Sequence, residues 1–168
     1  MKFKLRPWKL DDIDNLVEYA NNLKIAKNLT DQFPYPYSRE NGESFINMTL
    51  KHDPPQIFAI EINGKASGAI GLHQQSDIHL KNMELGYWLA EMYWGKGIMT
   101  KVVTQMVDYG FKTFKIKRIF ARPFGTNIGS QKVLEKAGFK LEGSFEKTIY
   151  KNGEYLDELV YAVRRENI

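Results

Sequence analysis

Apolar and polar positions alternate in two rhythms along the chain, and each rhythm predicts a kind of element. A short strand is expected at residues 3–7, and an amphipathic helix from Asp11, because apolar residues then recur every three or four positions. These residues are Ile13, Leu16, Val17, Ala20 and Leu23. Ser38 follows a proline-rich segment and is suited to cap a second helix. Two helices are therefore expected before the main strands.

The rest of the chain predicts strands with two further helices between them. A hairpin is expected to pair residues 56–62 with residues 65–73 around Asn63-Gly64, a sequence favoured in two-residue turns. The later elements expected are a strand at 82–90, a long helix opened by Gly95–Gly97, a strand at 118–122, a helix at 127–137, and strands at 139–151 and 154–164. This order predicts a mixed α/β (α+β) fold with a largely antiparallel sheet and one strand–helix–strand unit, a place where ligands often bind.

Composition narrows the class of protein. The 168 residues are 43% hydrophobic and 26% charged, which is typical of a globular domain and excludes disordered and collagen-like chains. The net charge is +4, but bases and acids are interleaved, which argues against a nucleic-acid-binding stripe. No apolar run is long enough for a membrane helix, and no secretory signal is recognisable. We expect a single cytoplasmic domain over residues 1–168 that binds neither nucleic acid nor membrane.

Two residue types limit the chemistry that is available. There is no cysteine, which excludes a disulfide framework, a thiolate nucleophile and cysteine-based metal sites. The three histidines do not form the H-E-x-x-H zinc pattern, and the carboxylates lack the spacing of a calcium loop. We therefore expect no metal.

The glycine pair Gly95 and Gly97 lies between a predicted strand and a predicted helix. Glycine lets backbone N–H groups turn toward an anion without a Cβ in the way, and a helix N-terminus adds further donors. The pattern lacks the Lys-Ser/Thr of a nucleotide P-loop, and Thr100 stands where a dinucleotide fingerprint needs a third glycine. Two interpretations stay open on these residues alone: a cradle for the pyrophosphate of coenzyme A, or a turn that glycine merely shapes.

Residues 92–97, Met-Tyr-Trp-Gly-Lys-Gly, and five other stretches follow the pattern of a known family. Together they resemble the GCN5-related N-acetyltransferase (GNAT) superfamily, and within it the RimJ/RimL-like branch that acetylates the N-termini of ribosomal proteins. The superfamily signature, Gln/Arg-x-x-Gly-x-Gly/Ala, falls on residues 92–97, where Met92 replaces the Gln or Arg. The other similar stretches are residues 33–37, 84–89, 127–139, 142–144 and 152–157. The resemblance implies a GNAT fold: a twisted, mostly antiparallel sheet of about seven strands flanked by helices, with a V-shaped opening between strands 4 and 5.

The resemblance also implies acetyl-CoA as cosubstrate and assigns the residues that hold it. The backbone of residues 88–90 would pair with the pantetheine arm, and the amides of residues 94–99 would hold the pyrophosphate. Thr100 would add its hydroxyl, and Lys96 either contacts phosphate or faces solvent. The cofactor-binding residues implied are Trp88, Leu89, Ala90, Trp94, Gly95, Lys96, Gly97, Ile98, Met99, Thr100, Asn127 and Ser130.

Direct acetyl transfer needs a group that accepts a proton from the amine. Glu84 resembles in place the catalytic glutamate of histone-acetylating relatives, and His73 is a second candidate. The resemblance places Ser130 near the sulfur as a general acid and makes the Leu89 amide the donor to the oxyanion. The alternatives are a structural carboxylate at Glu84 and plain helix capping by Asn127 and Ser130.

The expected activity is acyl transfer from acetyl-CoA directly to an amine, because the chain has no cysteine to carry an acetyl intermediate. Resemblance favours a protein N-terminal α-amine, as in the ribosomal-protein acetyltransferases. The alternatives are a small amine such as a polyamine, an amino acid or an aminoglycoside, and a non-catalytic acyl-CoA-binding module. Dimers are common in this branch, but the sequence leaves the oligomeric state open.

Overall fold

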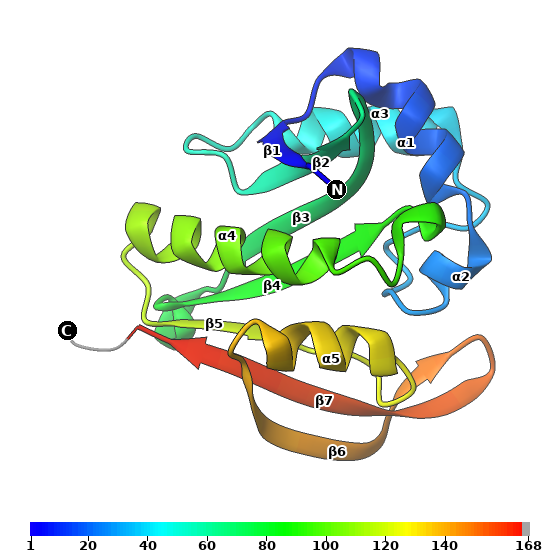
Figure 1. The fold of residues 1–168 in the computed structure, drawn as a ribbon. Coiled ribbons are helices and arrows are strands. Elements are labelled where there is room, and N and C mark those ends of the chain that lie inside the picture. The colour runs from blue at the N-terminus through cyan, green and yellow to red at the C-terminus, as the bar shows by residue number, and fades with distance from the viewer. Residues whose placement is uncertain (166–168) are drawn as a thin grey trace. The chain divides into compact units, whose positions relative to one another are not determined.

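The computed structural model describes residues 1–165 and contains one seven-stranded sheet with helices (Figure 1). The strands are β1 (Lys4–Pro7), β2 (Ile57–Ile62), β3 (Lys65–Gln74), β4 (Asn82–Leu89), β5 (Arg118–Ala121), β6 (Lys140–Lys151) and β7 (Glu154–Arg164). The helices are α1 (Ile13–Ala20), α2 (Leu23–Ala26), α3 (Arg39–Thr49), α4 (Ile98–Thr113) and α5 (Ile128–Lys136). Three short 3-10 turns complete the list: η1 (Leu10–Asp12), η2 (Asp77–His79) and η3 (Glu91–Tyr93). The strand order is β1-β2-β3-β4-β5-β7-β6, which confirms the expected mixed α/β fold class.

The chain packs into two compact units. The first comprises Met1–Gly71 and Tyr87–Ile98, and the second comprises Leu72–Gly86 and the chain from Met99 onward. Strands β3 and β4 contribute residues to both units. The expectation of a single domain over residues 1–168 stays a prediction.

In the first unit, helices α1 and α3 pack on an antiparallel sheet. Strand β2 pairs with β1 and with β3, and the Asn63-Gly64 turn joins β2 to β3 with φ of 51° and 78°. Both residues have the positive φ that a type I′ turn needs, which is why this sequence forms a tight hairpin. The core of this unit comprises Trp8, Ile13, Leu16, Ala20, Ile25, Tyr37, Ile46, Ile57, Ala59, Ala66, Ala69 and Trp88.

The helix predicted to reach Leu23 is interrupted in the structure. Helix α1 ends at Ala20, and α2 begins at Leu23 after Asn22, whose side-chain oxygen accepts a hydrogen bond from the Lys24 N–H at 2.9 Å. Asparagine side chains favour such caps over helix interiors. The apolar spacing therefore continues across a break that the cap imposes. The predicted cap at Ser38 is confirmed, since its hydroxyl accepts from the Asn41 N–H at 3.1 Å.

In the second unit, β4 and β5 are parallel neighbours over only three residue pairs. Their register begins at Asn82↔Arg118 and ends at Glu84↔Phe120, whereas β4 continues to Leu89. Strand β7 pairs antiparallel with both β5 and β6. Glu84 therefore marks the end of the β4–β5 ladder, which is the place where the resemblance predicts an opening between strands 4 and 5.

Helices α4 and α5 are fixed in the second unit by close contacts. A Cβ added at Gly110 of α4 would lie 2.6 Å from Leu72 Cδ1 and 3.1 Å from Ile119 Cδ1. Glycine lets the helix approach the sheet this closely without a shift of the Leu72 side chain. The hydroxyl of Tyr161 on β7 donates to the carboxylate of Glu135 on α5 at 3.0 Å. These contacts hold α4 and α5 against their strands.

Candidate acetyl-CoA and transfer site

The loop between β4 and α4 has the conformation that an anion cradle requires. Gly95 and Gly97 have φ of +70° and +71°, a region that side chains other than glycine rarely adopt. A Cβ added at either position would meet no protein atom within 4 Å. Glycine therefore preserves space that the chain itself does not fill. The loop leads directly into the sixteen-residue helix α4, whose first N–H groups lack partners within the helix.

Backbone and side-chain hydrogen bonds hold this loop to the end of β4. The indole N–H of Trp94 donates to the Leu89 carbonyl at 2.7 Å, and the Tyr93 N–H donates to the Ala90 carbonyl at 2.9 Å. The Lys96 ammonium lies 5.6 Å from the centroid of the Tyr93 ring. These bonds give the loop its shape, and Lys96 is directed onto an aromatic ring.

Hydrogen bonds at the end of β4 determine which backbone N–H groups of residues 88–90 can donate to a ligand. The Ala90 N–H donates to the Ser67 carbonyl at 2.8 Å, so it is occupied by β3. A strand residue turns its N–H and C=O to the same edge, and successive residues alternate. Leu89 therefore directs its N–H away from β3. Of these three amides, only that of Leu89 faces the edge where a pantetheine arm or an oxyanion would need a donor.

Close strand packing positions Trp88. A Cβ at Gly68 of β3 would lie 2.5 Å from the Trp88 carbonyl oxygen, so β4 approaches β3 at a point where only glycine fits. The Trp88 ring contacts Phe33 with centroids 5.9 Å apart, and Phe33 in turn contacts Tyr37 at 5.2 Å. The 33–37 segment is thereby packed beside the strand that is expected to bind the cofactor.

Glu84, the proposed base, forms a two-pronged ion pair with Arg122. Arg122 Nε lies 3.0 Å from Glu84 Oε1, and Arg122 Nη2 lies 3.2 Å from Oε2. The Glu84 hydrogen bond raises the pKa of Arg122 and outweighs the opposing effect of burial, with smaller contributions from the charges of Glu84 and Glu158. No motif in the sequence points to Arg122. Its position two residues beyond Phe120, the β5 partner of Glu84, would have been the signal.

His73, the other candidate base, lies over the same strand. A Cβ built at Gly86 would lie 3.6 Å from His73 Nε2. Gly86 and Glu84 are two residues apart on β4, so they share a face of the strand. The structure therefore brings both candidate bases to one face of β4.

Asn127 and Ser130 lie together at the start of α5. The Asn127 side-chain oxygen accepts a hydrogen bond from the Ser130 N–H at 3.2 Å, which is helix capping. The preceding loop is tied to β7, because the Gly125 N–H donates to the Asp157 carbonyl at 2.7 Å. A Cβ at Gly125 would lie 2.9 Å from Asp157 Cβ, so the loop can approach β7 only with glycine there. Met99 and Thr100 lie in the first turn of α4.

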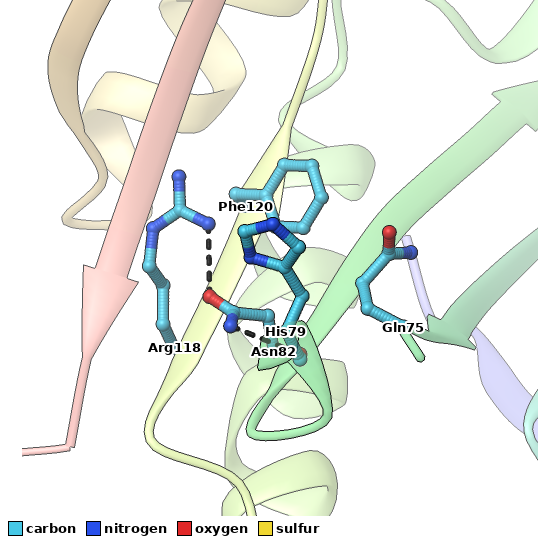
Figure 2. Close-up of a pocket in the computed structure, with 5 residues that line it drawn as sticks. All are labelled: Gln75, His79, Asn82, Arg118 and Phe120. Atoms are coloured by element: carbon cyan, nitrogen blue, oxygen red, sulfur yellow. Dashed lines mark hydrogen bonds between the residues drawn. The ribbon is translucent and has the colours of Figure 1, made fainter. Parts of the chain in front are cut away.

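A small polar pocket lies beside the start of β4 and β5 (Figure 2). Its volume is about 200 Å³, and it is lined by Gln75, His79, Asn82, Arg118 and Phe120. Two hydrogen bonds join lining residues: Arg118 Nη1 donates to Asn82 Oδ1, and Asn82 Nδ2 donates to the His79 carbonyl, both at 3.0 Å. The other guanidinium nitrogens of Arg118, Nε and Nη2, donate to Glu142 outside the pocket. None of the residues predicted for the site lines this pocket.

Two kinds of site have no counterpart in the described chain. Across residues 1–165, no group of three or more histidine or acidic side chains is placed to hold a metal ion. Over the same residues, every helix is too short or too polar to span a bilayer.

Comparison with known proteins identifies the family. The family described as an acetyltransferase (GNAT) domain matches residues 2–140. The chain therefore belongs to the GNAT acetyltransferases, enzymes that use acetyl-CoA as acyl donor. The expected enzyme class, N-acetyltransferase, and the expected cosubstrate are confirmed at the level of this family. The positive-φ glycines and the open space above them fit the cofactor that the family uses.

Three curated N-acetyltransferases are similar to this chain, and the names of two of them include an acceptor. The probable N-acetyltransferase YjcK of Bacillus subtilis is 42% identical over 96 residues, 57% of this chain and 53% of YjcK, so the match spans about half of that relative. The putative ribosomal N-acetyltransferase YdaF of the same organism is 32% identical over 60% of this chain and 55% of its own. The spermidine N(1)-acetyltransferase of Escherichia coli is 24% identical over 90% of this chain and 80% of its own.

Solved structures share the fold. A GNAT-family acetyltransferase from Bacillus anthracis has a TM-score of 0.84 and 26% identity, covering 99% of this chain and 97% of its own. The ribosomal L7/L12 α-N-protein acetyltransferase RimL in complex with coenzyme A has a TM-score of 0.85 and 23% identity, covering 98% and 94% of the two chains. The expected likeness to the RimJ/RimL-like branch is thus found in the fold.

Proposed function

We propose that this protein transfers the acetyl group of acetyl-CoA directly to the α-amine of a peptide or protein N-terminus. Binding of acetyl-CoA is supported above all by Gly95 and Gly97, which have positive φ and open space at both Cβ positions. Positive φ by itself favours glycine at both positions. The cofactor accounts in addition for the use of two such glycines, with open space above each, directly before the N-terminus of a long helix.

The cofactor contacts follow from the backbone of the loop. The amides of residues 94–99 would donate to the pyrophosphate, with Thr100 adding its hydroxyl. The Leu89 N–H, which faces away from β3, is the donor for the pantetheine arm or the oxyanion. The Ala90 N–H already donates to the Ser67 carbonyl. Trp88 and Ala90 would therefore help by holding the strand in place beside the cofactor. Asn127 and Ser130 would meet the arm from the start of α5.

The reaction exchanges a C–S bond for a C–N bond and moves one proton, in net terms, from nitrogen to sulfur. The amine nitrogen attacks the thioester carbonyl carbon, and a C–N bond forms while the carbonyl oxygen takes up negative charge. The oxyanion then collapses to an amide, the C–S bond breaks, and the thiolate gains a proton and leaves as CoA. Ser130 is proposed to supply the proton to sulfur, and Glu84 to receive the amine proton through a water molecule. Exchange with solvent then removes the proton from Glu84 and returns one to Ser130, so that both residues regain their starting states.

The ion pair with Arg122 is compatible with this role for Glu84. A carboxylate offers about four lone-pair positions, and Arg122 engages one on each oxygen. Positions remain for a water or for the incoming ammonium group. His73 lies on the same face of β4 and is the alternative acceptor of the proton.

The test compares thiol release from acetyl-CoA across a panel of amines that contains N-terminal peptides, amino acids and polyamines. We expect release with peptides, and a strong loss of turnover in Glu84→Gln with affinity for acetyl-CoA retained. An unchanged pH–rate profile in Glu84→Gln would remove Glu84 as the base. Tight binding of CoA with no release for any amine would instead support a non-catalytic acyl-CoA-binding module.

A further inference from the structure

We propose that Arg122 determines acceptor specificity by binding the carbonyl oxygen next to the reacting amine, which makes an α-amino amide the acceptor and disfavours polyamines. This inference rests on the proposed function, because it takes Glu84 as the point at which the amine arrives. It concerns only residues of the second unit. It gives a role in acceptor binding to a residue that lies outside the cofactor loop.

Arg122 uses one edge of its guanidinium for Glu84 and has donors left over. Nε and Nη2 bond the two carboxylate oxygens, whereas Nη1 makes no hydrogen bond to residues 1–165. A guanidinium carries five N–H donors in a planar fork. The Arg122 side chain is 47% exposed, so a ligand can reach the remaining donors.

Neighbouring charges hold the guanidinium in place. Glu84 on β4 binds it directly, and the negative charge of Glu158 on β7 makes a smaller contribution to stabilising its charged form. Glu158 is itself bridged to Phe124, two residues beyond Arg122. The cation is thereby fixed at the end of the β4–β5 ladder, beside the proposed base.

A carboxylate and a guanidinium side by side form a two-part receptor. An α-amino amide presents an amine and a carbonyl group separated by one carbon, and in this proposal the amine meets Glu84 while the carbonyl oxygen meets Arg122. The carbonyl oxygen accepts from Nη1, and the bond is strengthened by the charge of the donor. A polyamine offers no acceptor to Arg122 and brings a second positive charge toward it. Glu84 and Arg122 together thus favour α-amino amides as acceptors and disfavour polyamines.

The experiment measures KM and kcat by thiol release with two matched acceptors and spermidine. The matched acceptors are a short peptide with a free α-amine and a reduced analogue in which the first CO–NH unit is replaced by CH2–CH2, which removes the carbonyl oxygen without adding a charge. The variants are Arg122→Met, Arg122→Lys and, as control, Arg164→Met, which removes an exposed arginine that pairs with Glu142. Each variant is compared with the wild type on the same acceptor, so differences in amine basicity cancel.

We expect Arg122→Met to raise KM for the peptide by about tenfold to hundredfold, the effect of losing one charge-assisted hydrogen bond. KM for the reduced analogue should stay within about twofold, Arg122→Lys should fall between wild type and Arg122→Met, and Arg164→Met should match the wild type. Thermal melting and acetyl-CoA affinity verify that each variant is folded. Should Arg122→Met misfold, Arg122→Lys carries the same comparison.

Two results overturn the assignment while leaving direct transfer intact. One is an equal change in KM for the peptide and its reduced analogue. The other is a wild-type kcat/KM for spermidine above that for every peptide. Absence of thiol release from the wild-type protein with every amine would be a different failure, since it removes the proposed function and this inference together.

Discussion

Replacing Gly97 by alanine separates the two reasons for glycine in the β4–α4 loop. The matched control is Gly64→Ala in the β2–β3 turn. Gly64 has φ of +78° and Gly97 has φ of +71°, and a Cβ at either position meets nothing within 4 Å. Both substitutions therefore impose the same backbone strain without a steric clash. They differ only in whether a ligand is expected above the backbone.

The magnitudes follow from this comparison. Holding alanine at positive φ costs roughly 1 kcal/mol, which for a chain of this length lowers the melting temperature by about 3 °C in both variants. In Gly97→Ala the Cβ also occupies the space proposed for pyrophosphate. Loss of one hydrogen bond to a charged group costs about 1.5–3 kcal/mol, so Kd for acetyl-CoA should rise about tenfold to hundredfold.

The assay pairs thermal melting with calorimetric titration of acetyl-CoA. We expect both variants to melt slightly below the wild type and only Gly97→Ala to lose affinity. If Gly97→Ala binds acetyl-CoA as tightly as the wild type does, glycine at this position serves only the turn, and the cradle assignment is wrong. A comparable loss of affinity in Gly64→Ala would show that strain alone accounts for the effect.

Three further substitutions test other parts of the account. Gly125→Ala should lower stability by about 1–3 kcal/mol, measured by urea unfolding, because its Cβ would lie 2.9 Å from Asp157 Cβ. Ser130→Ala should slow acetyl transfer while the melting temperature is kept, and full activity would reduce Ser130 to a helix residue. Burial alone raises the pKa of Asp12, but hydrogen bonds from Arg6 and the Lys9 N–H outweigh it and bring the pKa below its usual value. Its folded pKa is thus below the unfolded one, so the stabilisation is present above about pH 4 and is lost as pH falls further. Asp12→Asn should lose about 3 kcal/mol at pH 7 and show a flatter acid limb of unfolding free energy against pH.

The hairpins were predictable from sequence because their turns are local. Asn63-Gly64 and Asn152-Gly153 each adopt positive φ at both residues, which their side chains tolerate without help from distant contacts. The break between α1 and α2 was predictable in principle from Asn22, but the apolar periodicity continued across it. Periodicity indicates which face of a helix is buried, but it does not indicate where one helix ends and the next, capped helix begins.

Local sequence patterns could not predict the pairing of Glu84 with Arg122. The two residues are 38 positions apart, and their contact depends on the parallel register of β4 and β5. A shift of one residue in that register would move Arg122 to the other face of the strand. The occupied Ala90 N–H is a similar case, because its partner Ser67 belongs to a strand whose register follows from packing. The sequence therefore indicates the chemistry of the site, whereas the partners of each group depend on tertiary structure.

Mass spectrometry of a peptide incubated with acetyl-CoA and the protein tests acetyl transfer to an α-amine most directly. We expect one acetyl group on the α-amine of the peptide, one CoA thiol released per acetylated peptide, and no acetyl group on the protein itself. In direct transfer the acetyl group passes from sulfur to the amine without being held on the protein, and the chain has no cysteine that could hold it. An unmodified peptide, with acetyl-CoA bound and intact, would contradict the account.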